Sequence, residues 1–287
     1  MCDARPNLSC RVLQARAQDM RQSTLAGSQP EIEFVLVVSS QDPMATVRDI
    51  SGLVSVGNFE MRPGGHEKIH DVYFDTPEGA LRRKKMTLRI REVNNEYFIT
   101  LKQNPGLFSR KRDERQELQL PWSPDSFDRV FAEFERRGIR LDRAKGRASN
   151  PSEALRNVGL KILQDRETER QTRLVLHGND IGPVLAELAI DSVTYHFDGR
   201  DIRLYELEIE AKSESGRAML KDVRREILEE FSSELRPWKW GKLATGRAIE
   251  RLLRAGNLEG FLNGDRLKGE AFAIIEDVMR GKSSGRA

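Results

Sequence analysis

The sequence predicts an α+β protein built on an antiparallel sheet, and three observations support this class. Several segments alternate apolar and polar residues, which is the pattern of a strand with one buried face. Some of these segments are joined by connections of hairpin length, which favours antiparallel over parallel pairing. Segments with helical spacing of apolar residues lie between the groups of strands, as they do in α+β domains.

The expected strands are located by their alternation and by the residues that end them. Pro77 and Pro121 each follow an alternating segment, and Asn94-Asn95 separates two others as a hairpin turn. We expect strands at residues 31–38, 70–76, 86–93, 96–103, 114–120, 171–177, 185–196 and 201–212. Helical spacing predicts helices at residues 43–53, 125–138, 153–163, 216–235, 243–254 and 267–279.

The charge of the chain is high in both signs but nearly balanced. Its 48 basic and 45 acidic residues leave a net charge of +3, which is too small to favour nucleic acid as a partner. An electrostatic function would therefore need local segregation of charge. No apolar run approaches the ~20 residues of a membrane helix, so we expect no membrane segment. Cys2 and Cys10 are too few to hold a fold together, and a cytoplasmic location is the default expectation.

Several expected strands devote one face to a single sign of charge. The longest case is the acidic row Glu206, Glu208 and Glu210, with apolar residues between its members. A second acidic pair lies at residues 31–33, and a basic pair at residues 89–91. The charged residues of each row point to the same face, because alternate side chains of a strand do so.

Two interpretations of these charged faces are open. In the first, an open sheet packs its apolar face on helices and exposes its charged face to water; in the second, the charged faces are enclosed. Carboxylates two residues apart lie roughly 7 Å apart and repel by about 0.6 kcal/mol in water, but by about 2.4 kcal/mol at an effective dielectric near 20. Enclosed acids therefore require cations such as Mg²⁺ or Mn²⁺, and enclosed Arg and Lys require anions such as phosphate. An acidic wall facing a basic wall is typical of a metal–polyphosphate site.

The order of several motifs resembles the CYTH superfamily, the triphosphate tunnel metalloenzymes. The matching segments are EIEFV at 31–35, YFDTPEGALRRKKMTLRIR at 73–91, FITLK at 98–102, RQELQL at 115–120, ELAIDSVTY at 187–195, ELEIEAK at 206–212 and WGKLATGRAI at 240–249. The resemblance implies a closed antiparallel eight-stranded β-barrel, a tunnel with a charged lumen and with helices packed outside. It also implies an activity on triphosphates with Mg²⁺ or Mn²⁺ as the cofactor.

The resemblance divides the chain into three parts. It places the CYTH triphosphate-tunnel domain at residues 30–250 and a C-terminal helical extension with a polar tail at residues 251–287. Residues 1–29 lack the apolar stretch of a secretion signal and are rich in Arg and Ser. We expect them to form a disordered tail, and an organellar transit peptide is the alternative.

The resemblance also implies roles for individual residues. It assigns catalysis to Glu31, Glu33, Glu208 and Glu210. It assigns metal binding to these four acids together with Glu117, Glu206 and Asp191. It assigns binding of the triphosphate to Arg89, Arg91, Lys102, Arg115, Arg173, Lys212 and Lys242. Arg112 and Glu114 are the alternative to Arg115 and Glu117 if the strand is shifted.

Val35 departs from the family signature Glu-x-Glu-x-Lys, in which its position is a lysine. Loss of that cation removes a group whose contribution to transition-state stabilisation would be a few kcal/mol, and Lys212 is a possible replacement. We expect a metal-dependent triphosphatase, a monomer or homodimer, that acts on a small-molecule triphosphate. Inorganic triphosphate is the first choice because no pocket for a base or thiazole ring can be identified. Thiamine triphosphatase and class IV-type adenylate cyclase are alternatives, and a non-catalytic polyphosphate-binding module, which Val35 favours, is the alternative of another class.

Two further motifs have ordinary explanations. The segment His66-Glu67-Lys68-Ile69-His70 matches a zinc-protease signature, but it leads into a strand and the signature requires a helix, so we interpret it as chance. The basic clusters at residues 82–85 and 110–112 are interpreted as solvated loops, with funnelling of a polyanion as the alternative. No aromatic residues are interleaved with them, so we expect no specific nucleic acid.

Overall fold

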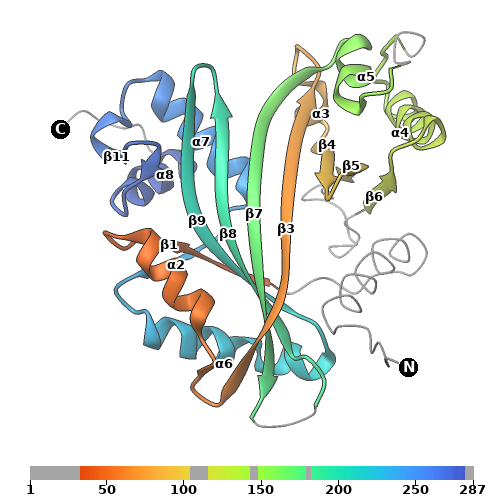
Figure 1. The fold of residues 1–287 in the computed structure, drawn as a ribbon. Coiled ribbons are helices and arrows are strands. Elements are labelled where there is room, and N and C mark those ends of the chain that lie inside the picture. Colours follow the sequence, from red (N-terminus) through yellow and green to blue (C-terminus); the bar gives the residue numbers. More distant parts are fainter. Residues whose placement is uncertain (1–32, 104–115, 143–147, 179–181, 282–287) are drawn as a thin grey trace, which may run out of the picture. The chain divides into compact units, whose positions relative to one another are not determined.

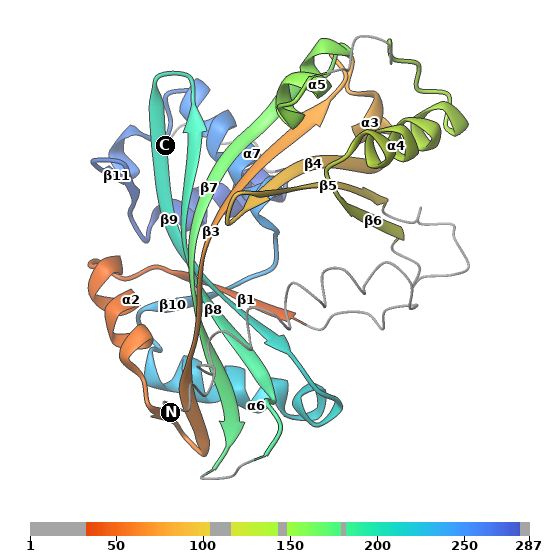
Figure 2. The same ribbon diagram turned by 45° about the vertical axis from the view of Figure 1, so that its right-hand side comes forward.

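The computed structural model describes residues 33–103, 116–142, 148–178 and 182–281, which belong to two compact units. Unit 1 comprises the described residues of 33–67 and 168–281, and unit 2 those of 68–167. Strands β3 (Phe59–Asp75) and β7 (Lys161–His177) contribute residues to both units. Figures 1 and 2 show the elements, which are described unit by unit below.

Twelve strands form one mostly antiparallel sheet. Its main path runs β10-β1-β9-β8-β7-β3-β4-β5-β6, and the short strands β2, β11 and β12 pair beside it. Among the described residues, no ladder joins the first strand of the path, β10 (Leu235–Trp238), to the last, β6 (Gln116–Pro121). The expected closed eight-stranded barrel is therefore wrong. Alternation within a strand specifies which face is buried, whereas closure depends on tilt, stagger and the pairing of two edge strands, and alternation encodes none of these.

The first hydrophobic core of unit 1 lies on one face of β1 (Glu33–Val38), β9 (Arg200–Ala211) and β8 (Ala186–Phe197). Leu36, Leu188, Leu207 and Ile209 are fully buried there, as their alternation predicts. Helices α2 (Pro43–Gly52) and α6 (Glu214–Glu230) pack on this face (Figure 2). Each helix begins where a side chain accepts a hydrogen bond from its first turn: Asp42 from the amide of Ala45, and Ser213 from the amide of Gly216.

The opposite face of β8 and β9 changes character along the strands. Toward their connecting turn it is apolar, and Val193, Tyr195, Ile202 and Leu204 are buried in a second core. This core also contains side chains of α7 (Lys242–Arg254) and α8 (Ala271–Met279), which contact each other. The segment between the two helices contains η2 (Glu259–Phe261), β11 (Leu262–Asn263) and β12 (Arg266–Leu267). Farther from the turn, the same face carries the acidic residues of the candidate site.

Unit 2 contains β4 (Met86–Val93), β5 (Glu96–Gln103), β6, α3 (Ala80–Arg83), α4 (Pro124–Arg136) and α5 (Pro151–Asn157). Its core joins Leu88, Ile90 and Ile99 of the strands to Phe131 and Phe134 of α4. The predicted hairpin turn at Asn94-Asn95 is confirmed, since both residues have positive φ (51° and 67°) between β4 and β5. The segment YFDTPEGALRRKK, which is part of a family motif, also has a structural role. Its buried Asp75 carboxylate accepts hydrogen bonds from three backbone amides around α3.

Two strands extend well beyond the lengths predicted from the sequence. β3 begins at Phe59 rather than near residue 70, preceded by the short β2 (Ser55–Val56) that pairs with it. β7 begins at Lys161 rather than near residue 171. Residues 161–170 are polar at most positions on both faces, so the apolar alternation that reveals other strands is missing there.

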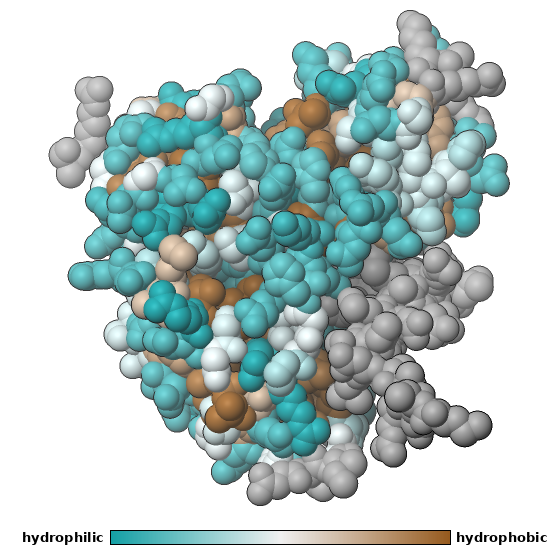
Figure 3. Space-filling view, viewed as in Figure 1, coloured by the Kyte–Doolittle hydropathy of each residue, from teal (hydrophilic) through white to brown (hydrophobic). Residues whose placement is uncertain are grey.

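The face of the molecule shown in Figure 3 is predominantly hydrophilic. On this face, hydrophobic residues form small separate patches. Among the described residues, the large hydrophobic side chains that are exposed are Met44, Val54 and Ile162. Isolated apolar residues of this kind are normal on protein surfaces. In the part of the chain with described coordinates, no helix has the length and apolar character required to cross a membrane.

Candidate functional site

The acidic row of β9 is extended by its neighbours through strand register. Glu206 lies opposite Asp191 of β8, and Glu210 lies opposite both Glu187 of β8 and Glu33 of β1. Residues opposite each other on paired strands share a face of the sheet. Asp191 and Glu206 are 0% and 1% exposed, so at these positions the charged face is not solvated. Of the two interpretations made from the sequence, the enclosed one therefore holds for these two acids.

Three carboxylates of unit 1 converge on one ammonium group. Lys242 is the first residue of α7, and its Nζ lies 3.0 Å from Asp191 Oδ2, 2.6 Å from Glu208 Oε1 and in contact with Glu206 Oε1. We call Asp191, Glu206 and Glu208 the acidic cluster; one carboxylate oxygen from each lies within 4.8 Å of the other two. The N-terminus of a helix disfavours a cation, so these acids, and not the helix, stabilise the ammonium group there.

Arg170 of β7 is the second cation of the acidic cluster. Its Nε donates to Asp191 Oδ1 at 2.8 Å, and its Nη2 donates to Asp191 Oδ2 at 2.6 Å and to Glu208 Oε2. The three acids and two bases leave a formal charge of −1. Glu206 Oε2 is buried and has no hydrogen-bond partner among the described residues, which is costly for a carboxylate.

The pKa values of the cluster reflect opposing effects of burial and ion pairing. Burial would raise the pKa of Asp191 and of Glu208, but Lys242 and Arg170 outweigh it and hold both pKa values below their usual range. Burial prevails at Glu206, whose pKa is raised in spite of Lys242. Burial would lower the pKa of Lys242, yet the three acids raise it well above its usual range. Glu206 is therefore the acid whose charge is least well compensated.

Val35 lies directly beside the acidic cluster. In the register of β1 and β9 it is opposite Glu208, and it packs against the second core of unit 1. The family lysine at this position would therefore stand next to Glu208. In this chain the cations that contact Glu208 are Lys242 and Arg170.

Lys212, the sequence-based candidate to replace that lysine, pairs with other acids. Its Nζ lies 2.6 Å from Glu210 Oε2 and 3.7 Å from Glu187 Oε1. Glu33 is exposed at the start of β1, opposite Glu210. The structure thus separates the predicted acids of unit 1 into the buried acidic cluster and a more exposed group around Glu210.

Arg173 lies on the other face of β7. The side chain of nearby Val175 belongs to the first hydrophobic core, and the Arg173 guanidinium donates to the backbone carbonyls of Met61, at 3.0 Å, and Leu53. Arg173 was predicted to bind the triphosphate, which requires the charged face of its strand. A shift of one residue in register moves a side chain to the opposite face, and in the structure Arg173 lies on the apolar face. The charged face of β7 carries Arg166, Thr168 and Arg170 instead.

Unit 2 contains a cluster of the opposite sign around Asp71 of β3. Arg91 donates to both oxygens of this fully buried carboxylate, at 2.7 and 2.8 Å. Arg166 donates to Oδ2, and Arg89 Nε lies 3.5 Å from Oδ1. We call Arg89, Arg91 and Arg166 the arginine cluster. Burial would raise the pKa of Asp71, but the three guanidinium groups hold it well below its usual range.

The arginine cluster has more positive charge than Asp71 can neutralise. Three cations and one anion leave a formal charge of +2, and Arg89 and Arg166 are 7% and 2% exposed. The Tyr73 ring lies 5.9 Å from Arg89 and 5.6 Å from Arg166, and burial, which would raise its pKa, is outweighed by these arginines, so that the pKa of Tyr73 is lowered. A buried excess of guanidinium groups is suited to binding an anion with several oxygen atoms.

The other predicted residues contribute less to either cluster. Lys102 is exposed on β5, where its backbone pairs with that of Glu117. Glu31 and Arg115 lie outside the described residues. Asp71, Arg166 and Arg170 were missed by the sequence analysis; alternation of Arg166, Thr168 and Arg170 on one strand was the signal that would have identified the two arginines.

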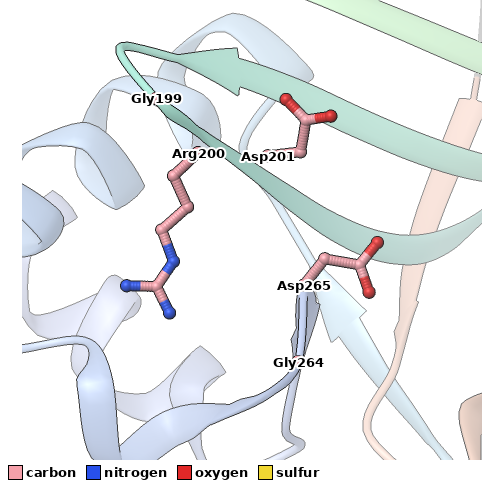
Figure 4. Close-up of a pocket in the computed structure, with 5 residues that line it drawn as sticks. All are labelled: Gly199, Arg200, Asp201, Gly264 and Asp265. Carbon is pink, nitrogen blue, oxygen red and sulfur yellow. The ribbon is translucent and has the colours of Figure 1, made fainter.

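The zinc-protease interpretation has no support in the structure, because the His66–His70 motif lies within strand β3 instead of a helix. A surface pocket at the β8–β9 turn is lined by Gly199, Arg200, Asp201, Gly264 and Asp265. Figure 4 shows the side chains of Arg200, Asp201 and Asp265 pointing in different directions. Since they do not converge on a common point, we take the acidic cluster of unit 1 and the arginine cluster of unit 2, each by itself, as the candidate functional residues.

Comparisons with known proteins agree with the motifs. A family model, the CYTH domain, matches residues 29–237, which is more than two thirds of the chain. A search of the curated proteins gives no match.

A search of the solved structures gives matches, three of which have a named activity. A candidate adenylyl cyclase from Hippeastrum with a dominant triphosphatase activity is 18% identical, with 77% of this chain and 96% of that chain covered and a TM-score of 0.47. A candidate adenylate cyclase from Bacillus halodurans is 22% identical, with 76% and 97% covered and a TM-score of 0.42. An inorganic triphosphatase is 15% identical, with 67% and 81% covered and a TM-score of 0.24. Because these TM-scores are below 0.5, the family assignment rests on the family match.

Proposed function

The chain belongs to the CYTH domain family, and from this premise we propose that it hydrolyses a triphosphate with the help of a divalent metal ion. The family includes triphosphatases and adenylate cyclases, which supports a triphosphate-related activity. The observation that carries the proposal is the convergence of three carboxylates in the acidic cluster, two of them fully buried. Buried acids at this separation require cations, and Lys242 and Arg170 leave the three acids a formal charge of −1, which favours binding of a divalent metal ion.

The acidic cluster fits Mg²⁺ or Mn²⁺ by its chemistry. It offers only oxygen ligands, as these ions prefer, and Glu206 Oε2 lacks a hydrogen-bond partner among the described residues. Asp191, Glu206 and Glu208 would hold the ion, and Glu33 and Glu210 are proposed to assist from the more exposed end of the same face. When bound, such an ion neutralises charge on phosphoryl oxygens and lowers the pKa of water.

Basic residues of each unit are proposed to bind phosphate groups. The arginine cluster carries an excess charge of +2 around Asp71, and guanidinium groups match phosphate oxygens bidentately. Lys102 is exposed on the same unit and can contribute a further cation. Lys242 has its ammonium group among the acids and would contact phosphoryl oxygens close to the metal site, while Arg170 holds the carboxylates of Asp191 and Glu208.

The reaction requires placement and charge neutralisation more than covalent chemistry. A carboxylate of the acidic cluster would orient a water molecule in line with the terminal phosphorus. The water oxygen forms the new P–O bond, the bridging P–O bond breaks, and the shorter polyphosphate leaves while a proton passes to solvent. Arginine and lysine side chains offset the charge on the phosphoryl oxygens during this step.

Inorganic triphosphate is the proposed substrate. The surface pocket at the β8–β9 turn includes none of the residues of the acidic cluster, so this pocket gives no support to thiamine triphosphate or ATP as the substrate. A second candidate function, binding of polyphosphate without turnover, is favoured by one observation: Val35 stands opposite Glu208, where the family signature has a lysine.

The test is release of orthophosphate from tripolyphosphate, thiamine triphosphate and ATP, each with Mg²⁺ or Mn²⁺ and each repeated with excess EDTA. We expect metal-dependent release, fastest from tripolyphosphate. Formation of cyclic AMP and pyrophosphate from ATP would instead identify a cyclase. Tight binding of tripolyphosphate without release from any substrate would identify the non-catalytic module and refute the hydrolase.

A further inference from the structure

We propose that Lys242 is the built-in counter-ion of the acidic cluster: its ammonium group occupies the place of the divalent cation and has to leave it before the metal binds. The inference rests on the metal site of the proposed function and assigns to that site a form of regulation. It makes binding of metal alone weak and couples metal binding to binding of the phosphate anion.

Lys242 and a metal ion would compete for the same carboxylates. The oxygen atoms that Lys242 Nζ contacts are one from each acid, Asp191 Oδ2, Glu206 Oε1 and Glu208 Oε1. One oxygen from each of the same acids makes up the candidate ligand set, whose members lie within 4.8 Å of one another. A metal ion binds carboxylate oxygens at about 2.0–2.6 Å, so an ion among these oxygens would overlap the ammonium group. The two cations therefore exclude each other.

Arg170 and Lys242 have different roles in the acidic cluster. Arg170 Nε donates to Asp191 Oδ1, and its Nη2 donates to Glu208 Oε2, so each of these acids has a contact with Arg170 on the oxygen that Lys242 does not use. These contacts can persist when a metal replaces the ammonium group, and they keep the two carboxylates oriented. Lys242 has no such second set of acceptors in the cluster. Arg170 is thus a positioning residue and Lys242 is the group that is displaced.

Glu206 is the acid of the cluster whose charge is least well compensated. Its Oε2 is buried and has no hydrogen-bond partner in the described part of the chain, and the contact of its carboxylate with a cation is through Oε1 to Lys242. A monovalent ammonium group leaves the cluster one charge short of neutrality. A divalent ion in the same place supplies the missing charge, so the cluster is built for a stronger cation than the one that it contains.

The consequence is that triphosphate promotes metal binding. Once displaced, the Lys242 ammonium group needs another anion, and its flexible four-carbon stem allows it to reach a phosphoryl oxygen near the cluster. Tyr195 Oη donates to the Lys242 carbonyl at 2.8 Å, so the backbone stays anchored while the side chain moves. The acidic cluster is then loaded by the metal–triphosphate complex and not by the free ion.

The experiment measures Mn²⁺ binding to the full chain without triphosphate, by titration calorimetry after metal has been removed with EDTA and dialysis. Lys242→Met removes the competing charge, and we expect its Kd for Mn²⁺ to be at least about tenfold lower than that of the wild type. Lys239→Met is the matched control, since Lys239 is exposed and its ammonium group lies over the Trp240 ring; its Kd should equal that of the wild type. Adding Glu206→Gln to Lys242→Met should abolish the gain.

An Mn²⁺ affinity of Lys242→Met no higher than that of the wild type would overturn the proposal. If the variant is unfolded without metal, Mn²⁺ should restore its circular dichroism at concentrations that do not change the melting temperature of the wild type, and failure to restore it also contradicts the proposal. No turnover enters these measurements. Absence of phosphate release by the wild type would therefore refute the hydrolase and leave the competition between Lys242 and metal standing.

Discussion

Replacement of Asp71 by asparagine tests the arginine cluster, because it removes one charge and changes the shape of the side chain very little. Asp71 is fully buried and is the acid that Arg89, Arg91 and Arg166 share. Without its charge, three guanidinium groups lie together and lose the carboxylate that offsets their repulsion. Breaking a buried ion pair by removing one partner destabilises proteins by about 3–5 kcal/mol.

The expected magnitude follows from the burial of the cluster. For a chain of this size, 1 kcal/mol lowers the melting temperature by about 2–4 °C, so Asp71→Asn should lower it by about 6–20 °C. Asp222→Asn is the matched control: the Asp222 side chain on α6 is 47% exposed and lies 2.8 Å from the exposed Arg225. Exposed pairs of this kind contribute about 0–1 kcal/mol, so the control should melt within a few degrees of the wild type.

The assay is thermal and urea-induced unfolding at neutral pH, with and without tripolyphosphate and in the absence of metal. A bound polyanion can replace the lost carboxylate charge, so tripolyphosphate should stabilise Asp71→Asn by more than it stabilises the wild type. If Asp71→Asn unfolds within about 1 kcal/mol of the wild type, the ion pairs around Asp71 do not have the energetic role given to them here.

Two further predictions concern stability. Gly216→Ala should destabilise the protein by more than about 2 kcal/mol, because a Cβ atom at this position would lie 1.7 Å from the Leu185 carbonyl oxygen. The control is Gly52→Ala, whose Cβ would meet nothing within 4 Å and which should be neutral or stabilising by about 0.5–1 kcal/mol. Equal urea midpoints for the two variants would contradict this packing. The pKa of His70 is raised, mainly by its 2.7 Å hydrogen bond with Asp165. The stability that this pair contributes should therefore be fully present below pH 6.5 and be lost as pH rises through the higher folded-state pKa. Asp165→Asn should not show this loss of stability between pH 6 and 8.5, and an identical pH dependence in wild type and variant would contradict the role of the pair.

The buried faces of the strands could be predicted from the sequence, but the closure of the sheet could not. Alternation placed Leu36, Leu207 and Ile209 in the first core of unit 1, because burial of one face is a property of a single strand. A closed barrel requires the edge strands β10 and β6 to pair, which depends on the twist and stagger of all the strands between them. That information is not local, and it was taken from the family resemblance alone.

The candidate site shows the same limit. Asp191, Glu206, Glu208 and Lys242 were all identified from motifs, and the structure brings them together. Their catalytic and binding roles stay predictions. Arg170 was missed because residues 161–170 are polar on both faces, so the strand and its register were not recognised. Because the strand register was not recognised, Arg173 was predicted in place of Arg170. In the structure Arg173 lies on the apolar side of β7.

The central claim is that the acidic cluster supports metal-dependent hydrolysis of a triphosphate, and the most direct measurement is the rate of Mg²⁺-dependent orthophosphate release by Glu208→Gln. We expect release from tripolyphosphate to be at least about 100-fold slower than in the wild type, a loss of about 2.7 kcal/mol of transition-state stabilisation. Glu229→Gln, on the exposed side of α6, should retain the wild-type rate. Release by Glu208→Gln as fast as by the wild type would contradict the assignment of the acidic cluster.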